Sequence, residues 1–382
     1  MERVRVILVG GFLGSGKTTL LHRVARNLKS VGKRVALITN DQASELVDTE
    51  FLRRDGLKVG EVSGGCFCCK FPELASQAER AIAVESAEVI LGEPVGSCTD
   101  LSATVIQPLK HLYGDKFDVA PLTVLVDPSR VQEAFQGEGS RRFPDSVYYI
   151  FWQQIAEADT IVINKSDLIP AAELGRLGRQ VTERFPETPV IAMSARTGAG
   201  FELWLDFIDS RAPSGQRIAQ VDYEVYAEGE AVLGWLNARL RIEAPLGADW
   251  GAFAATWVAG MQQLLKVEEA EIAHIKLALS TSAGSIAANL TNSVSEPLIR
   301  GKIAERSREA TVVVNARVHI DPEELARIFQ ESLPTSSGEH LQTQILSLQS
   351  FSPARPQPTH RYSSVVRHPL DKVRTDPLRY QS

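Results

Sequence analysis

Long apolar runs, an excess of positive charge and a histidine-rich stretch are all missing from this sequence of 382 residues. A helix that crosses a membrane needs about 20 consecutive apolar residues. No run reaches that length, so we expect no membrane association. The formal net charge of −6 argues against general nucleic-acid binding, which uses basic surfaces. The seven histidines are scattered, which argues against a histidine-rich metal store.

Cysteine is also scarce, and its four copies all lie between Cys66 and Cys98. The first apolar run begins within a few residues of Met1 and leads straight into a glycine-rich loop. We therefore expect no signal peptide and a cytoplasmic protein. A cytosolic chain that uses cysteine in one region only is more typical of a metal or redox site than of structural disulfides.

A complete phosphate-binding motif stands near the N-terminus. The apolar run 6–9 predicts a buried strand, the pattern Gly-x-x-x-x-Gly-Lys-Thr occupies 11–18, and helical spacing follows from residue 20. The glycines let backbone N–H groups approach phosphate oxygens. Lys17 would neutralise the β- and γ-phosphates, and Thr18 is the expected Mg²⁺ ligand. The predicted phosphate-site residues are Gly11, Gly14, Ser15, Gly16, Lys17, Thr18 and Thr19.

Two carboxylates follow further predicted strands. Asp41 ends the apolar run 34–41, and Glu93 follows the run 89–91. Because ligands bind at the carboxyl edge of parallel sheets, Asp41 is placed to sense the γ-phosphate or Mg²⁺, and Asp48 is a weaker candidate. Glu93 could hold a Mg²⁺-bound water or orient the attacking water. The candidate catalytic residues are thus Lys17, Asp41 and Glu93, although either carboxylate could instead be an exposed turn or capping residue.

A second nucleotide motif, Asn-Lys-Ser-Asp, follows the predicted strand 160–163. Asp167 can accept two hydrogen bonds from guanine, which adenine cannot provide. Asn164 would support the loop and reach the base, and the Lys165 stem would cover the ring. Ser194, Ala195 and Arg196, at the end of the predicted strand 190–196, could offer a backbone N–H to the guanine oxygen.

The cysteines form a compact group. Cys66, Cys68 and Cys69 stand in the stretch Gly-Gly-Cys-Phe-Cys-Cys, where a loop could wrap a soft cation such as zinc or copper(I). Cys98 lies two residues beyond Gly96, in a loop expected to sense the γ-phosphate, and could supply a fourth ligand. The alternatives are a redox pair or ordinary buried thiols.

The length and composition fit two domains and a tail. We predict an α/β fold: a mostly parallel P-loop GTPase sheet with helices on both faces over residues 1–212. A smaller α+β domain would occupy 220–332, and an extended or partly disordered tail 333–382. Within this tail, residues 353–361 could pack against the domains or a partner. In the second domain we predict a strand at 223–227, a helix at 231–240 and a strand at 274–279. His274 and His319 are expected to be core or edge residues.

Together these motifs resemble the CobW-type metal-related GTPases, relatives of the urease and hydrogenase nickel-insertion GTPases. The resemblance covers residues 4 to about 208. It implies that Lys17 and Thr18 bind phosphate and Mg²⁺, that Glu93 lies in the hydrolysis loop, and that Asn164 and Asp167 bind guanine. Cys66, Cys68 and Cys69 would bind metal. The chain departs from the family pattern at Pro94 and Val95, where small hydroxyl residues are usual, and at Cys98.

The main hypothesis is a GTPase that couples nucleotide state to metal binding and delivery. Its cofactors would be GTP, Mg²⁺ and Zn²⁺ or another thiophilic divalent metal. Its partner would be a client metalloprotein or cofactor enzyme, and a homodimer is compatible with the sequence. The alternatives are a GTP-dependent chaperone or reactivase with only a structural metal, a small-molecule phosphotransferase, and a binding module without turnover.

Overall fold

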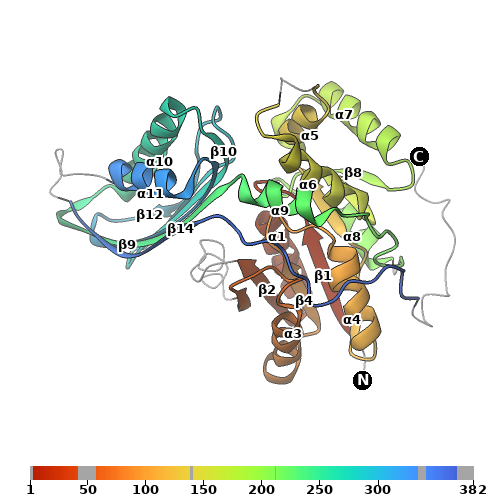
Figure 1. Cartoon of the computed structure of the whole chain (residues 1–382). Coiled ribbons are helices and arrows are strands. Elements are labelled where there is room, and N and C mark those ends of the chain that lie inside the picture. The colour runs from red at the N-terminus through yellow and green to blue at the C-terminus, as the bar shows by residue number, and fades with distance from the viewer. Residues whose placement is uncertain (1–2, 42–56, 138–140, 211, 334–340, 368–382) are drawn as a thin grey trace.

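The computed structural model describes residues 3–41, 57–137, 141–210, 212–333 and 341–367. Within these ranges the strands form two separate sheets, one of eight strands and one of six. Figure 1 shows the two sheets side by side, each with its own helices. None of the helices in the described ranges is both long and apolar enough to traverse a bilayer.

The elements of the first sheet alternate between strands and helices. In chain order they are β1 (Val4–Gly10), α1 (Lys17–Ser30), β2 (Val35–Asp41), β3 (Lys58–Ser63), α3 (Phe71–Glu85), β4 (Val89–Glu93), a π-helical segment (Ser102–Ile106), α4 (Gln107–Leu112), β5 (Phe117–Val119), β6 (Thr123–Val126), α5 (Pro128–Ala134), α6 (Asp145–Ala156), β7 (Thr160–Ile163), a 3-10 turn (Ser166–Leu168), α7 (Ala171–Arg184), β8 (Val190–Ala192) and α8 (Phe201–Asp209). The helix α9 (Tyr223–Ala231) follows and leads to the second sheet.

Every pairing in the first sheet is parallel, in the order β3-β2-β4-β1-β6-β7-β8, with β5 pairing with the start of β1. Its strands are almost continuously apolar because helices cover both faces. Leu20, Leu21 and Trp204 of α1 and α8 pack on one face, and Phe71 and Ile150 of α3 and α6 belong to the core on the other. The predicted parallel α/β sheet is confirmed.

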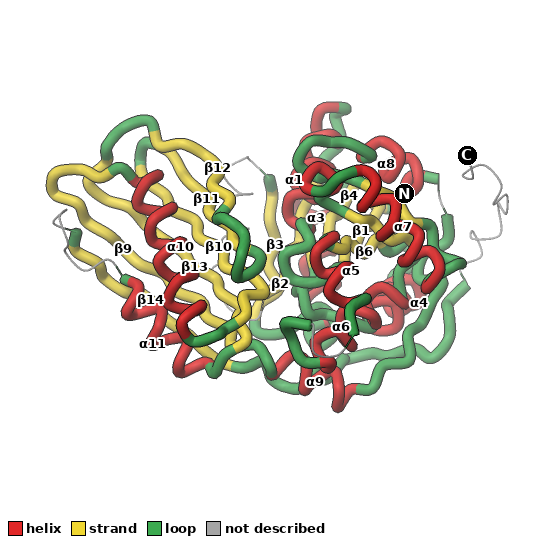
Figure 2. The backbone as a smooth tube through the Cα atoms, turned by 90° about the horizontal axis from the view of Figure 1, so that it is seen from above, coloured by secondary structure: helices red, strands yellow, loops and turns green. Residues whose placement is uncertain are grey.

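The second sheet, with its helices, is called the second domain here. Its elements are β9 (Gly234–Ala248), α10 (Trp250–Val267), β10 (Glu271–Thr281), β11 (Gly284–Leu290), β12 (Leu298–Ile303), β13 (Ser307–His319), α11 (Pro322–Ser332) and β14 (Gln342–Phe351). The strands are antiparallel in the order β12-β11-β10-β13-β9-β14. Viewed from above, the second sheet lies beside the first domain (Figure 2), and the end of β2 lines a cavity together with residues of β10 and β13.

Three parts of the second half differ from the sequence-based expectation. Residues 223–227 belong to helix α9, whose N-terminus is capped by the Asp222 carboxylate through Glu224 and Val225. Residues 234–240, predicted to be helical, are the start of strand β9. Within the predicted tail, residues 342–351 form edge strand β14 on β9. The strand at 274–279 lies within β10 as predicted.

Candidate functional site

The phosphate loop joins β1 to α1 and depends on close packing at its glycines. Gly11 has φ +129°, and a Cβ there would lie 2.2 Å from the Leu125 carbonyl oxygen of β6. At Gly16, φ is +98°, and a Cβ would lie 2.4 Å from the Asn164 side-chain nitrogen. Larger residues would displace the loop from both neighbours. This explains why a glycine-rich turn stands between these two elements.

Polar groups of this loop are arranged for an anionic ligand. The Lys17 ammonium donates to the Gly11 carbonyl at 2.8 Å. The Ser15 hydroxyl is buried and finds no hydrogen-bond partner among the described residues. A buried hydroxyl without a partner is costly, so a ligand oxygen at this position would be favourable. These features fit a bound phosphate chain.

Glu93 lies at the carboxyl end of β4 and reaches the first turn of α1. The Thr18 hydroxyl donates to the Glu93 carboxylate at 2.7 Å, and the Glu93 side chain is buried. A hydroxyl and a carboxylate this close are oxygen ligands of the kind that Mg²⁺ prefers. Strand β4 lies next to β1 in the sheet. This neighbourhood brings Thr18 and Glu93 together at one site.

The second nucleotide motif is connected to the phosphate loop by Asn164. Its side-chain nitrogen donates to the Ser15 carbonyl at 2.8 Å, and its side-chain oxygen accepts from the Ala195 N–H at 2.8 Å. Asn164 thus joins the phosphate loop to the loop after β8. These two bonds brace the loops, and a contact of Asn164 with the base stays a prediction.

Asp167 is the carboxylate predicted to read guanine. It accepts from the Arg196 guanidinium. Partial burial alone would raise the pKa of Asp167, but hydrogen bonds from Ser194 and Arg196 outweigh it and hold that pKa below its usual range. An ionised acceptor is the form that binds two N–H donors. Lys165 is tied by an ion pair to Asp127, at the end of β6.

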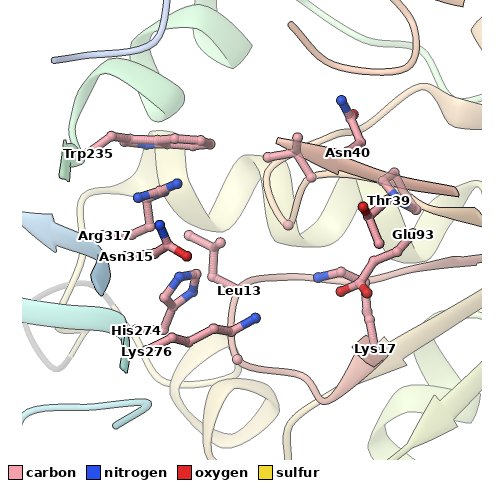
Figure 3. Close-up of a pocket in the computed structure, with 14 residues that line it drawn as sticks. Leu13, Lys17, Thr39, Asn40, Glu93, Trp235, His274, Lys276, Asn315 and Arg317 are labelled. Carbon is pink, nitrogen blue, oxygen red and sulfur yellow. The ribbon is translucent and has the colours of Figure 1, made fainter. Parts of the chain in front are cut away.

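A cavity of about 390 Å³ connects these groups. One wall comes from the phosphate loop and the two loops of the base motif. The opposite wall comes from the second domain, which the sequence did not predict to take part. The lining residues from the second domain are His274, Lys276, Asn289, Thr291, Ser295, Glu296, Leu298 and Arg300. A smaller adjoining cavity, shown in Figure 3, lies between Lys17, Asn40 and Glu93 on one side and His274, Lys276 and Arg317 on the other.

The cysteines form one cluster beside this site. The sulfur of Cys66 lies 2.7 Å from that of Cys68 and 3.2 Å from that of Cys69, and the sulfurs of Cys68 and Cys69 are 3.7 Å apart. All four cysteines are free thiols. Zinc–sulfur bonds of about 2.3 Å in a tetrahedron place sulfurs ~3.8 Å apart, so a small outward movement would admit such an ion.

The pKa values of the four thiols are shifted in different directions. Hydrogen bonds with Cys68, Cys69 and Cys98 lower the pKa of Cys66, whereas hydrogen bonds with Cys66, Cys69 and Cys98 raise the pKa of Cys68. Contact with Cys66 raises the pKa of Cys69 to about 11 and also raises the pKa of buried Cys98. One thiolate among several thiol donors is a compact, soft ligand set. The sulfurs of Cys66, Cys68 and Cys69 lie within 4.8 Å of one another. Cys98 interacts with Cys66 and Cys68 from a separate loop, and its role as a fourth ligand stays a prediction.

Asn40 connects the cysteine loop to the end of β2. Its side-chain nitrogen donates to the carbonyls of Val62 and Gly65 at 3.0 and 2.7 Å, and its side-chain oxygen accepts from the Phe67 N–H at 2.8 Å. The sequence reasoning missed this residue. An asparagine directly after an apolar strand was the available signal. The neighbouring Asp41 ends β2, but its side chain and the whole of Asp48 lie outside the described residues.

A C-terminal segment covers the outer side of the cysteine loop. We call residues 352–367 the C-terminal strap, and Figure 1 shows this blue segment crossing the first domain. The Thr359 N–H donates to the Cys68 carbonyl at 2.9 Å, its hydroxyl donates to the Cys69 carbonyl at 3.0 Å, and the Gln357 N–H donates to the Cys69 sulfur at 3.2 Å. Arg361 pairs with buried Asp100 at 2.6 Å. The sequence left open whether residues 353–361 pack against the domains, because proline and serine are also typical of disordered tails.

A parallel sheet with a phosphate loop between β1 and α1, and a base motif after β7, defines a P-loop nucleotide-binding protein. Residues 5–192 match the family model of the CobW/HypB/UreG nucleotide-binding domain. The chain belongs to this CobW/HypB/UreG family.

Several curated relatives agree with this assignment. Urease accessory protein UreG 2 of Bradyrhizobium is 30% identical over 217 residues, which cover 53% of this chain and 88% of the relative. The zinc chaperone CobW of Pseudomonas aeruginosa is 26% identical over 226 residues, covering 51% of this chain and 58% of the relative. For the CobW of Sinorhizobium, the matched share of the relative is 60%. The chain therefore spans less than two thirds of the length of these two relatives.

Solved structures with similar chains include HypB of Archaeoglobus fulgidus and Zn(II)-bound YjiA GTPase of E. coli. The first is 24% identical and covers 54% of this chain and 89% of its own, with a TM-score of 0.37. The second is 15% identical and covers 87% of this chain and 100% of its own, with a TM-score of 0.38.

Proposed function

We propose that this protein is a GTPase that couples its nucleotide state to the binding and delivery of a thiophilic metal, zinc above all, to a client metalloprotein or cofactor enzyme. The observation that carries the proposal is the short path from Glu93 to Cys98. Glu93 accepts from the Thr18 hydroxyl at 2.7 Å. Five residues later, the Cys98 thiol interacts electrostatically with Cys66 and Cys68. A change at the phosphate site would therefore reach the thiols through one loop.

The loop between these two residues is held at its centre. Gly96 packs against the phosphate loop, because a Cβ there would lie 2.6 Å from the Leu13 side chain. The Gln154 side chain donates to the carbonyls of Gly96 and Cys98 at 2.9 and 2.8 Å. The loop is thus a braced segment whose two ends face the nucleotide and the metal. Such a segment can shift between two positions as one unit.

In this mechanism Mg²⁺ supplies charge neutralisation for the phosphates, and Thr18 and Glu93 would hold it, directly or through water. Lys17 neutralises the phosphate charge, and Glu93 is also placed to orient an attacking water. Asp167, kept ionised by Ser194 and Arg196, favours guanine over adenine. Asp41 remains a proposed sensor of the γ-phosphate because it ends β2 at the same edge.

The names of the curated relatives support a role in zinc handling. They include zinc chaperones and a zinc-regulated GTPase metalloprotein activator of Dictyostelium discoideum, which is 25% identical over 199 residues. Zinc fits the cluster because thiolates are its usual ligands in proteins.

The test measures linkage. If nucleotide and metal are coupled, zinc must alter GTP affinity by the same factor by which GTP alters zinc affinity. We expect this factor to be at least about fivefold for a nonhydrolysable GTP analogue and to be lost in Cys66→Ser, which should keep nucleotide binding. Equal analogue affinities with and without zinc, in a chain that binds both, would refute the coupling. Sedimentation of the same samples tests for a homodimer.

One observation favours a second candidate, a GTP-dependent chaperone whose metal is purely structural. The C-terminal strap covers the cysteine loop through Thr359 and Gln357, and such cover would hinder release of an ion. Elemental analysis before and after single-turnover GTP hydrolysis, with a chelator present, separates the two. Zinc that leaves with hydrolysis supports delivery. Zinc that stays bound through turnover supports the structural role.

A further inference from the structure

The second sheet carries its helices on one face only. Side chains that alternate along β10 and β13, such as Leu277 and Val314, belong to the core with α10 and α11. The side chains between them stand on the opposite face, because successive residues of a strand point to opposite sides. This helix-free face is polar and basic. From β10, β12 and β13 it presents His274, Lys276, Arg300, Asn315 and Arg317 to the cavities beside the phosphate loop.

The face is in direct contact with the phosphate loop. A Cβ on Gly14 would lie 3.2 Å from the Thr291 side chain and 3.6 Å from the Ala273 carbonyl oxygen. Arg130 of α5 holds the same two segments, donating to the carbonyls of Ile272 in β10 at 3.1 Å and of Thr291, just after β11, at 3.3 Å. Ala273 is a fully buried member of the first domain's core. The contact is therefore part of the packed interior.

His274 is the buried polar group of this face. It is 7% exposed, and its Nδ1 has no hydrogen-bond partner among the described residues. Burial lowers the pKa of His274, and the charges of Lys276, Arg317 and Lys17 lower it further. Lys17 is thus near enough to act on the ring. A neutral imidazole offers one N–H donor and one acceptor, and His274 lines both cavities.

Lys276 is the cation best placed to meet a ligand. It lines both cavities, together with Lys17, Glu93 and His274. Arg317 is fixed within the sheet, since its guanidinium donates to the carbonyls of Leu236 and Ala316 and lies 4.0 Å over the Trp235 ring. Figure 3 shows His274 and Lys276 directed from the second domain toward the loop that carries Leu13 and Lys17.

We propose that the second domain completes the nucleotide site, with Lys276 contacting the terminal phosphate of GTP and His274 hydrogen-bonding to it. This inference rests on the proposed GTP site. In P-loop hydrolases the terminal phosphate is commonly met by a cation from a second element, which neutralises the charge that develops during transfer. GDP lacks that phosphate and would leave Lys276 without this contact. The γ-phosphate would therefore add a contact to the packed interface between the two domains, and its loss would loosen the strand that carries Lys276.

The test compares a nonhydrolysable GTP analogue with GDP in equilibrium titrations of the full chain. Lys276→Met should weaken the analogue by about tenfold or more, the scale of a lost charge-assisted hydrogen bond. GDP affinity should stay within about twofold. Lys302→Met is the matched control, because Lys302 stands exposed on β12 and lines neither cavity. It should bind both nucleotides as the wild type does, and Lys276→Arg should recover most of the lost affinity.

A second measurement needs no variant. Hydrogen exchange of peptides that cover 271–281 in the wild type should be slower with the analogue than with GDP. Unchanged analogue affinity in Lys276→Met, an equal loss for both nucleotides, or identical exchange with the two nucleotides would each overturn the inference while leaving the GTP site intact. A wild-type chain that binds neither nucleotide would instead overturn the proposed function, and this inference with it.

Discussion

Asn164 offers a sharp test of how the nucleotide site is built. Its amide joins two loops that are far apart in sequence, through the Ser15 carbonyl and the Ala195 N–H, both at 2.8 Å. The side chain is 2% exposed. Replacing it with alanine removes both bonds and leaves two buried backbone groups without their partner.

The magnitude follows from these two bonds. An unsatisfied buried polar group costs about 1–3 kcal/mol, so Asn164→Ala should lower the free energy of unfolding by roughly 2–5 kcal/mol. Asn164→Asp separates the two contributions. Its carboxylate still accepts from Ala195, but it places an acceptor against the Ser15 carbonyl, so we expect a loss at least as large as that of one bond.

The assay is urea unfolding followed by tryptophan fluorescence, with the loss calculated from the midpoint at constant m-value. Asn27→Ala, at a half-exposed position of α1, is the control and should change stability by no more than about 0.5 kcal/mol. The same Asn164→Ala protein should bind GDP and GTP analogues more weakly to an equal extent, since the brace supports the whole phosphate loop. An Asn164→Ala protein as stable as the Asn27→Ala control would refute the reasoning.

Two further predictions concern the surroundings of the cysteine cluster. Burial and the nearby Cys66 raise the pKa of Glu230 to about 8, against a hydrogen bond from Ser97, so the folded state holds this proton more tightly than the unfolded state does. That stabilisation is complete below about pH 4.5 and is lost as the pH rises through 8, so the wild type should lose about 3 kcal/mol of unfolding free energy between pH 5 and 8 relative to Glu230→Gln. Parallel pH profiles of urea unfolding for the two proteins would contradict this. Truncation after Phe351, which removes the C-terminal strap, should speed the reaction of Cys69 with a thiol reagent at least several-fold, whereas truncation after Arg367 should not. Equal rates in the two truncated chains would show that the strap does not protect the thiol.

The first domain could be predicted because its signals are local. Each strand that bears a motif is a short apolar run, and the motif follows it directly, as at Lys17, Glu93 and Asn164. The carboxyl ends of parallel strands meet at one edge, so strand order was not needed to expect Thr18 and Glu93 in one site. The three close cysteines were equally local.

The second half of the chain was harder to predict because its apolar residues match helical and strand spacing equally well. Residues 231–240 contain Leu233, Leu236 and Leu240, which match helical spacing, but Leu236, Ala238 and Leu240 match strand alternation equally well. The sheet settles the choice, because β9 pairs with both β13 and β14. The role of β10 in the cavity could not be read from sequence at all. It depends on how the second domain packs on Gly14 and Arg130, which no local pattern encodes.

The arrangement also explains why the cysteines belong next to this nucleotide site. The carboxyl ends of β2 and β4 each provide one connection to the cluster: Asn40 bonds to the cysteine loop, and Glu93 leads to Cys98. Both residues line the same cavity as Lys17. A ligand that draws these two strand ends toward its terminal phosphate would therefore move Cys98 relative to Cys66 and Cys68. Because a zinc ion requires sulfurs near fixed separations, even a small relative movement would change its affinity, and hydrolysis would reverse the movement.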